Sequence, residues 1–240
     1  MMNAKTFRLF IVLLISIVFP TPSQGGEPSS TLSSLSGKSK TELPTIQGLY
    51  FSADVFGYIY PIFMKDKYYS TEISATMNIN NRFLPTIEVG LGHTNMVSQL
   101  YDIGYRTRAP YYRIGMDYNM QYKKGKPNYI YLGGRVGYTS FSYSVDAPPL
   151  IDPIWGNSVS MQLTDLPCHA IWAEAVGGVR AEISKNLYLG WSLRYKLPLH
   201  RGPISNGGPW YIPGFGTGKE NAFGATYTIS YYFNLTRKRL

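Results

Sequence analysis

The sequence predicts an all-β fold, an eight-stranded antiparallel up-and-down transmembrane β-barrel with short periplasmic turns and long extracellular loops. Three observations predict it. The stretch 222–233 alternates without a break between apolar residues and small or polar ones, and it ends in aromatic residues. Such alternation is typical of a strand with one face in lipid and the other in a polar lumen. Seven further stretches with this alternation precede it, and the connections between them are alternately long and short, as in membrane barrels.

The N-terminal residues indicate export. Lys5 and Arg8 precede an apolar run, 9–19, that is too short to cross a bilayer of about 30 Å as a helix. A basic start followed by a short apolar run is typical of a secretory signal peptide, which we assign to residues 1–25. Residues 26–46 are rich in Ser, Thr, Pro, Gly and Lys and lack periodicity, so they are predicted to form a disordered linker.

The composition suits a membrane barrel better than a soluble domain. Apolar residues make up 44% of the chain and charged residues only 15%, whereas a typical soluble domain carries about 25% charged residues. The chain also contains 21 tyrosines and 24 glycines, which fit strands between lipid and a crowded interior. Cys168 is the single cysteine, so no intrachain disulfide can form, and we interpret it as a small apolar residue.

Turn-forming residues separate the predicted strands and set the boundaries of the barrel domain. Breaks occur at Asn80-Asn81, at the stretch 124–127 and at Lys185-Asn186. The barrel is assigned to residues 47–234 and is followed by a basic tail, 235–240. The eight predicted strands are 48–59, 69–80, 83–93, 110–121, 128–143, 168–183, 186–199 and 222–234.

The alternation also assigns charged residues to one face of these strands. A charge in lipid is costly, so this face must line the lumen, where acids and bases can pair. An eight-stranded barrel is about wide enough for side chains to fill it. We therefore predict a closed, salt-bridged interior rather than an ion pathway. The predicted lumen network consists of Asp54, Glu72, Glu88, Arg113, Asp117, Arg135, Glu174, Arg180, Glu182, Arg194 and Lys196.

Aromatic residues gather near the strand ends, which predicts one belt at each membrane interface. The expected periplasmic belt consists of Tyr50, Phe83, Tyr129, Tyr188, Tyr231 and Phe233, and the expected outer belt of Tyr58, Tyr60, Tyr111, Tyr112 and Trp172.

The eight segments, the loop rhythm and the terminal Tyr231-Tyr232-Phe233 resemble the small outer-membrane barrels of the OmpX/OmpA-like class of Gram-negative bacteria. Residues 48–234 also resemble an uncharacterised Bacteroidota family of outer-membrane barrels known only as a domain of unknown function. The resemblance implies location in the cell outer membrane among its lipids. It also implies insertion by the outer-membrane assembly machinery, which reads an aromatic C-terminal strand, here with Tyr231 and Phe233 as the insertion signal.

Residues that could carry chemistry are few, and we assign no catalytic, metal-binding or cofactor-binding residue. His93, His169 and His200 are expected at the extracellular rim, but on strands that keep His93 away from the other two. We therefore interpret them as ordinary rim residues. The alternative is a lipid-modifying enzyme of the lipid A acyltransferase or deacylase type, for which His93 with Ser98, or His200 with Ser205, would be the candidate pair.

The predicted loops 94–109, 144–167 and 200–221 suggest a structural, adhesive or binding role for a monomer. Exposed aromatic residues among glycines and prolines often mark a contact surface, here for an extracellular protein or glycan. The basic residues form no face with a nucleic-acid recognition element, so a nucleic-acid partner is not expected. A soluble ligand-binding barrel would need apolar residues inside, whereas the predicted lumen is charged. The loop contact candidates are Trp155, Trp210, Tyr211 and Phe215.

Overall fold

The computed structural model describes residues 46–55, 57, 68–98, 102–124, 128–151, 158–203, 208–217 and 220–235. The chain divides into two units, Met1–Glu42 and Leu43–Leu240, and all the described residues belong to the second. The predicted signal peptide, the linker up to residue 45 and the tail from residue 236 lie outside the described residues. Within the described ranges, no helix has the length and apolar character needed to cross a bilayer.

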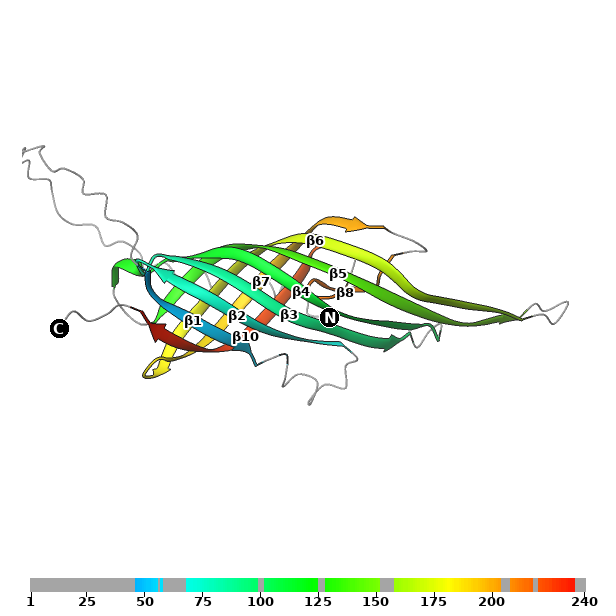
Figure 1. The fold of residues 1–240 in the computed structure, drawn as a ribbon, viewed down its shortest axis with the longest axis horizontal. Helices are drawn as coiled ribbons and strands as arrows, with labels where there is room; N and C mark the ends of the chain where they lie inside the picture. Colours follow the sequence, from blue (N-terminus) through cyan, green and yellow to red (C-terminus); the bar gives the residue numbers. More distant parts are fainter. Residues whose placement is uncertain are drawn as a thin grey trace, which may run out of the picture. The chain divides into compact units, whose positions relative to one another are not determined.

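Eight strands close into an antiparallel up-and-down barrel, which confirms the predicted fold class (Figure 1). The strands follow one another around the ring in chain order, and the last one, β10, closes the ring against β1. A two-stranded hairpin, β8 (Tyr211–Ile212) with β9 (Gly216–Thr217), lies between β7 and β10, and a short 3-10 helix, η1 (Tyr122–Lys124), follows β4. The barrel strands are β1 (Ile46–Asp54), β2 (Tyr68–Ile79), β3 (Phe83–Val97), β4 (Gly104–Asn119), β5 (Tyr129–Ile151), β6 (Ser158–Ser184), β7 (Leu187–Gly202) and β10 (Ala222–Asn234).

The strands β3 to β7 continue beyond their predicted ends, and Figure 1 shows β5 and β6 running past the other strands. The regions 94–109 and 144–167, predicted as loops, are therefore largely strand. The second region contains Pro148 and Pro149, which lack the N–H that a ladder needs. In the structure they fall where the register between β5 and β6 shifts, a position at which a sheet tolerates proline.

The two faces of the wall follow the predicted alternation. Glu72 and Arg113, predicted to line the lumen, are buried, whereas their apolar chain neighbours Ile73 and Ile114 are 60% and 63% exposed. The same holds on β7, where Trp191 and Leu193 are exposed and Arg194 is buried. The wall is therefore apolar outside and charged inside, the reverse of a soluble protein.

The two predicted aromatic belts are only partly correct. Phe83, Tyr112, Tyr231 and Phe233 do face outward. Tyr50, Tyr129, Tyr188, Tyr111 and Trp172 are instead buried in the lumen, while Tyr58 and Tyr60 lie outside the described residues. The reason is the period of two: Tyr50 has the same parity as the inward Asp54, so it cannot face lipid.

The polarity of both faces reverses along the long strands. On β5 the outward face changes from the exposed Val136 and Tyr138 to Ser140 and Ser142. The inward face changes in the same interval from the charged Arg135 to apolar residues that pack together as a core. This core consists of Tyr105, Ala109, Tyr111, Phe141, Tyr143, Cys168, Ala170, Trp172, Tyr211, Ile212 and Phe215.

Candidate functional site

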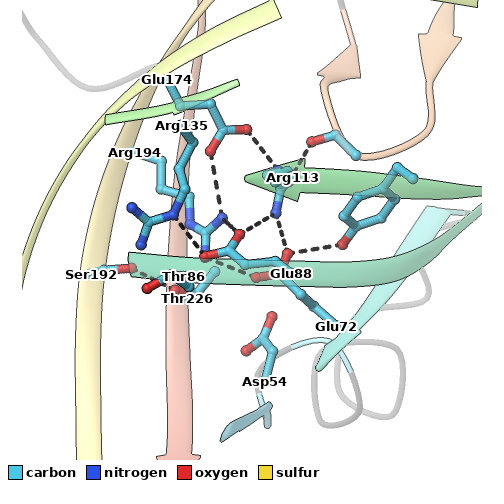
Figure 2. A network of polar contacts seen from close by, with 12 residues as sticks. Asp54, Glu72, Thr86, Glu88, Arg113, Arg135, Glu174, Ser192, Arg194 and Thr226 are labelled. Atoms are coloured by element: carbon cyan, nitrogen blue, oxygen red, sulfur yellow. Dashed lines mark hydrogen bonds and ion pairs between the residues drawn. The ribbon is translucent and has the colours of Figure 1, made fainter. Parts of the chain in front are cut away.

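A cluster of ion pairs fills the centre of the lumen (Figure 2). Each of the six strands from β2 to β7 contributes at least one member, and β1 and β10 contribute none to the ion pairs of the described residues. All the side chains are at least 94% buried. This ion-pair cluster consists of Glu72, Glu88, Arg113, Asp117, Arg135, Glu174 and Arg194.

Glu88 on β3 lies at the centre of this cluster. Its Oε2 lies 2.7 Å from Arg194 Nη1 and 3.2 Å from Arg113 Nη1, and its Oε1 lies 3.0 Å from Arg135 Nε. Arg194 Nη2 also donates to Glu72 Oε1 at 2.8 Å, which joins β7 to β2 across the lumen. Every charge of the cluster except Asp117 thus has at least two charged partners, and Asp117 makes two hydrogen bonds to Arg135, the condition under which a buried ion pair is tolerated.

Two aromatic residues complete the cluster. Tyr111 donates its hydroxyl to Glu72 Oε2 at 3.0 Å, and the indole N–H of Trp172 donates to Glu174 Oε1 at 2.6 Å. Both rings also lie against the Arg113 guanidinium, at 4.6 Å and 6.0 Å from its central carbon. The sequence analysis missed these roles because it assigned Tyr111 and Trp172 to the outer belt. Their parity with the inward Arg113 and Glu174 was the signal that could have revealed them.

Four residues of the predicted lumen network lie outside the ion pairs of the described residues. Asp54 is buried and accepts from the backbone N–H of Tyr227 at 3.3 Å. Glu182 lies at the β6–β7 turn, where its Oε1 accepts from the N–H of Asn186 at 3.2 Å. The other two, Arg180 and Lys196, are buried on either side of the cluster.

Arg180 is surrounded by tyrosines at the end of the lumen that carries the short turns. Its guanidinium carbon lies 4.5 Å from the Tyr50 ring centroid, and its Nη1 donates to the Tyr129 hydroxyl at 3.0 Å. Tyr188 and Tyr232 pack edge-on against each other, and both pack against Tyr50. These rings pack around the buried guanidinium at this end of the barrel, as cation–π and edge-on aromatic contacts favour.

The hairpin β8–β9 folds into the other end of the lumen, where it lines a cavity of about 550 Å³. Lys196 Nζ donates to the carbonyls of Gly214 at 2.7 Å and Phe215 at 3.1 Å, and Arg113 Nη2 donates to Gly214 at 2.7 Å. Hydrogen bonds from two lumen cations therefore hold the turn of the hairpin in place. Gly214 has a φ of +79°, a left-handed conformation that favours glycine, so the tight turn depends on this residue.

This placement corrects the expectation for the contact candidates. Tyr211 and Phe215 were expected on an exposed loop, but they are 5% and 2% exposed because the hairpin folds into the barrel mouth. Trp210 is 39% exposed and stacks on Tyr105 with ring centroids 5.7 Å apart. Trp155 lies outside the described residues.

The three histidines lie near the level at which the outward face becomes polar. His93 pairs with Arg108 between β3 and β4, while the His169 and His200 rings stack with centroids 5.3 Å apart. In the part of the chain that the structure describes, no three His, Cys, Asp or Glu side chains are grouped to hold a metal ion. Ser205, one candidate nucleophile, lies outside that part.

Comparison with known proteins gives a family. A family model described as a domain of unknown function, DUF6048, matches residues 6–238, and the chain belongs to this family. Neisserial surface protein A has 15% identity and a TM-score of 0.41 over 80% of this chain and 100% of that one. A major outer membrane protein from Thermus thermophilus has 11% identity and a TM-score of 0.45, over 78% and 98%. The comparison with curated proteins found no match.

Proposed function

We propose that this member of the DUF6048 family is an outer-membrane β-barrel protein whose barrel anchors an extracellular β-sheet that binds a partner outside the cell. A cleaved signal peptide would export the chain. The outer-membrane assembly machinery would then insert it as a monomer, with the C-terminal strand ending in Tyr231 and Phe233 as its signal. The outer-membrane lipids would surround the apolar outer face of the wall.

The observation that carries this proposal is the reversal of polarity along the strands. In the part of the barrel nearer the short turns, the exposed face is apolar and the interior is charged, which fits lipid outside and a polar lumen inside. In the part of β4 to β6 farther from the short turns, the outward residues, such as Arg106, Ser140 and Ser142, are polar, and the inward residues form an apolar core. The same strands therefore form a wall with an apolar, lipid-facing surface and, beyond it, a sheet with a polar, solvent-facing surface.

The lengths of the strands agree with this division. A tilted strand needs about 9–11 residues to cross a membrane. β5 has 23 residues and β6 has 27, so more than half of each lies beyond the apolar band. A barrel whose strands end at the membrane surface would not need this extension, and its presence favours a role at the cell surface.

The packing of side chains in the lumen argues against transport as the main activity. The tyrosines around Arg180, the ion-pair cluster and the hairpin β8–β9 follow one another along the lumen and leave no straight passage described through it. The outer face of the extended sheet carries Arg106, Arg108 and several hydroxyl groups, which suit a protein or glycan with acidic or hydroxyl groups.

The test uses intact cells that express the full chain. Replacement of residues 147–161 by a short Gly-Ser linker should abolish binding to a glycan array or to extracellular matrix proteins. A matched variant, Arg106→Gln with Arg108→Gln, keeps residues 147–161 of β5 and β6 and tests whether charge selects the partner. Unchanged binding by the linker variant would refute the contact role. A purified protein that is soluble without detergent, with the same gel mobility boiled and unboiled, would refute the membrane barrel.

A further inference from the structure

Two neighbouring short turns of the barrel are joined by hydrogen bonds. The turn between β2 and β3 is tight, with positive φ angles of 53° and 56° at Asn80 and Asn81, a conformation that asparagine tolerates better than most residues. Asn119, at the end of β4, donates its side-chain N–H to Asn81 O at 2.8 Å and its backbone N–H to Arg82 O at 2.9 Å. These bonds fix the β2–β3 turn against the residues that follow β4, so the side chains of the two turns are held in one arrangement.

The Arg82 side chain lies among three aromatic rings that these turns bring together. Its guanidinium carbon lies 5.1 Å from the Phe83 ring centroid, 5.3 Å from that of Tyr118 and 5.0 Å from that of Tyr122. The rings pack edge-on, with centroids 5.7 Å apart for Phe83 and Tyr118 and 6.0 Å apart for Tyr118 and Tyr122. The rings therefore position Arg82, while its side-chain N–H groups have no acceptor among the described residues.

A second cation lies beside the same rings, and no acid accompanies the two. Lys123, in η1, is exposed, and its Nζ lies 5.8 Å from the centroid of the Tyr122 ring that also contacts Arg82. In the described parts of both turns the nearest acid in sequence is Asp117, which is buried in the lumen and pairs with Arg135. Neither Arg82 nor Lys123 forms an ion pair with a described residue. Two uncompensated positive charges at one surface favour the binding of an anion.

The turn cluster, formed by Arg82, Phe83, Tyr118, Tyr122 and Lys123, lies at the edge of the apolar outer face. Farther from the turns, the outward residues of β3 and β4 pair as Pro85 with Met116 and as Ile87 with Ile114. Met116, Ile87 and Ile114 are exposed. The outer face therefore changes from two cations to a surface without charge, which matches the headgroup and the chains of a membrane lipid.

The turn between β6 and β7 differs in composition and provides a comparison at the same end of the barrel. It carries the exposed Lys185 close in sequence to Glu182, and no described aromatic ring lies within cation–π distance of Lys185. Ile183 is exposed there, as Met120 is beside the turn cluster. Because this turn has one acid for its one base, it is not expected to select an anion.

We propose that the turn cluster binds the phosphate group of an anionic phospholipid in the membrane leaflet at the short turns, with the acyl chains along Met116 and Ile87. The proposal rests on the outer-membrane location proposed above. The guanidinium of Arg82 donates to the phosphate oxygens, which its planar set of N–H groups matches, and the ammonium of Lys123 adds a second charge. A zwitterionic phospholipid has the same phosphate, but its own cationic group is repelled by the two cations, so a headgroup with a net negative charge is preferred.

The test is native mass spectrometry of the folded full chain in detergent, titrated with phosphatidylglycerol or with phosphatidylcholine of the same acyl chains. Phosphatidylglycerol should bind more tightly. Arg82→Gln and Lys123→Gln should each weaken its binding about fivefold, the effect of one basic residue at an anionic lipid surface, and should leave phosphatidylcholine binding nearly unchanged. The matched control is Lys185→Gln, which removes one exposed cation at the same end of the barrel and should leave the preference for phosphatidylglycerol intact.

Photo-crosslinking in nanodiscs locates the bound lipid. A phosphatidylglycerol with a diazirine next to the headgroup should label Phe83 and Met120 in preference to Ile183, an exposed apolar residue beside the β6–β7 turn. Combining Arg82→Gln with Lys123→Gln should remove this preference. A mobility shift on boiling confirms the fold of each variant. If Arg82→Gln does not fold, Lys123→Gln alone provides the test, because Lys123 is exposed and contacts a single ring among the described residues.

Equal affinity for the two lipids, or an unchanged preference in a folded variant that lacks either cation, would overturn the proposal. An equal loss in Lys185→Gln would do the same, because it would show that only the total charge matters. Displacement of the lipid by inorganic phosphate at the same concentration would overturn the lipid assignment in favour of a soluble anion. A protein that shows the mobility shift but no lipid preference refutes the turn-cluster site alone, whereas a protein that is soluble without detergent refutes the membrane location.

Discussion

Arg113→Met should cost about 3–5 kcal/mol of unfolding free energy, because removing one partner of a buried ion pair leaves uncompensated charge. Arg113 contacts Glu72, Glu88 and Glu174 and donates to the hairpin carbonyl of Gly214. Its loss leaves four carboxylates in the ion-pair cluster against two guanidinium groups. Methionine is also a long, unbranched side chain, so the change removes the charge and its hydrogen bonds while part of the packing remains. The measurement is urea unfolding in lipid vesicles, followed by tryptophan fluorescence and extrapolated linearly.

The matched control is Arg106→Met. Arg106 pairs with Asp146 at 2.6 Å, but its side chain is 61% exposed and its partner's 36%, so the loss should be about 0–1 kcal/mol. Adding Glu72→Gln to Arg113→Met should restore part of the stability, because it removes one of the carboxylates left in excess. Equal costs for Arg113→Met and Arg106→Met, or no recovery in the double variant, would refute the argument that the cluster depends on charge balance.

Three further predictions test the membrane boundary, the hairpin and the buried thiol. On intact cells, Ser142→Cys should react with a membrane-impermeant maleimide and Val136→Cys should not, since only Ser142 lies above the apolar band. Gly92→Leu should cost about 1–3 kcal/mol in urea unfolding, because a Cβ there would lie 2.8 Å from the hairpin at Pro213, while Gly134→Ala, with 3.8 Å of clearance, should cost little. Burial raises the pKa of the Cys168 thiol, which should react with maleimide at neutral pH only after unfolding.

The alternation of the sequence predicted the ring of strands and the inward face, because a strand can place its charged side chains only on one side of the sheet. It could not predict which charges pair. Glu72 and Arg194 are 122 positions apart and meet because opposite walls of a narrow barrel bring their ends together. Glu182 has the same parity as Glu174 but lies at a turn, so it falls short of the cluster.

The tyrosines around Arg180 and the hairpin β8–β9 were predicted wrongly, because general rules on aromatic and loop residues were applied in place of the residue alternation. Tyr50, Tyr129 and Tyr188 were assigned to a belt because aromatic residues collect at membrane interfaces, although their parity placed them in the lumen. The stretch around Ile212 and Phe215 was assigned to an exposed loop because it is rich in glycine and proline. Its apolar side chains were the sign that this loop folds inward, since so many apolar residues on one short connection gain free energy from burial.

The ion-pair cluster connects some strands of the ring and leaves others to backbone pairing. The cluster links the strands β2 to β7 through side chains, whereas β1 and β10 are held to each other and to the wall mainly by backbone pairing and aromatic contacts. β1 is also the shortest strand of the ring, nine residues against 27 in β6. Local opening requires least free energy where fewest interactions are lost. The barrel is therefore most firmly connected where these charges lie, and we expect local opening first at the boundary between β1 and β10.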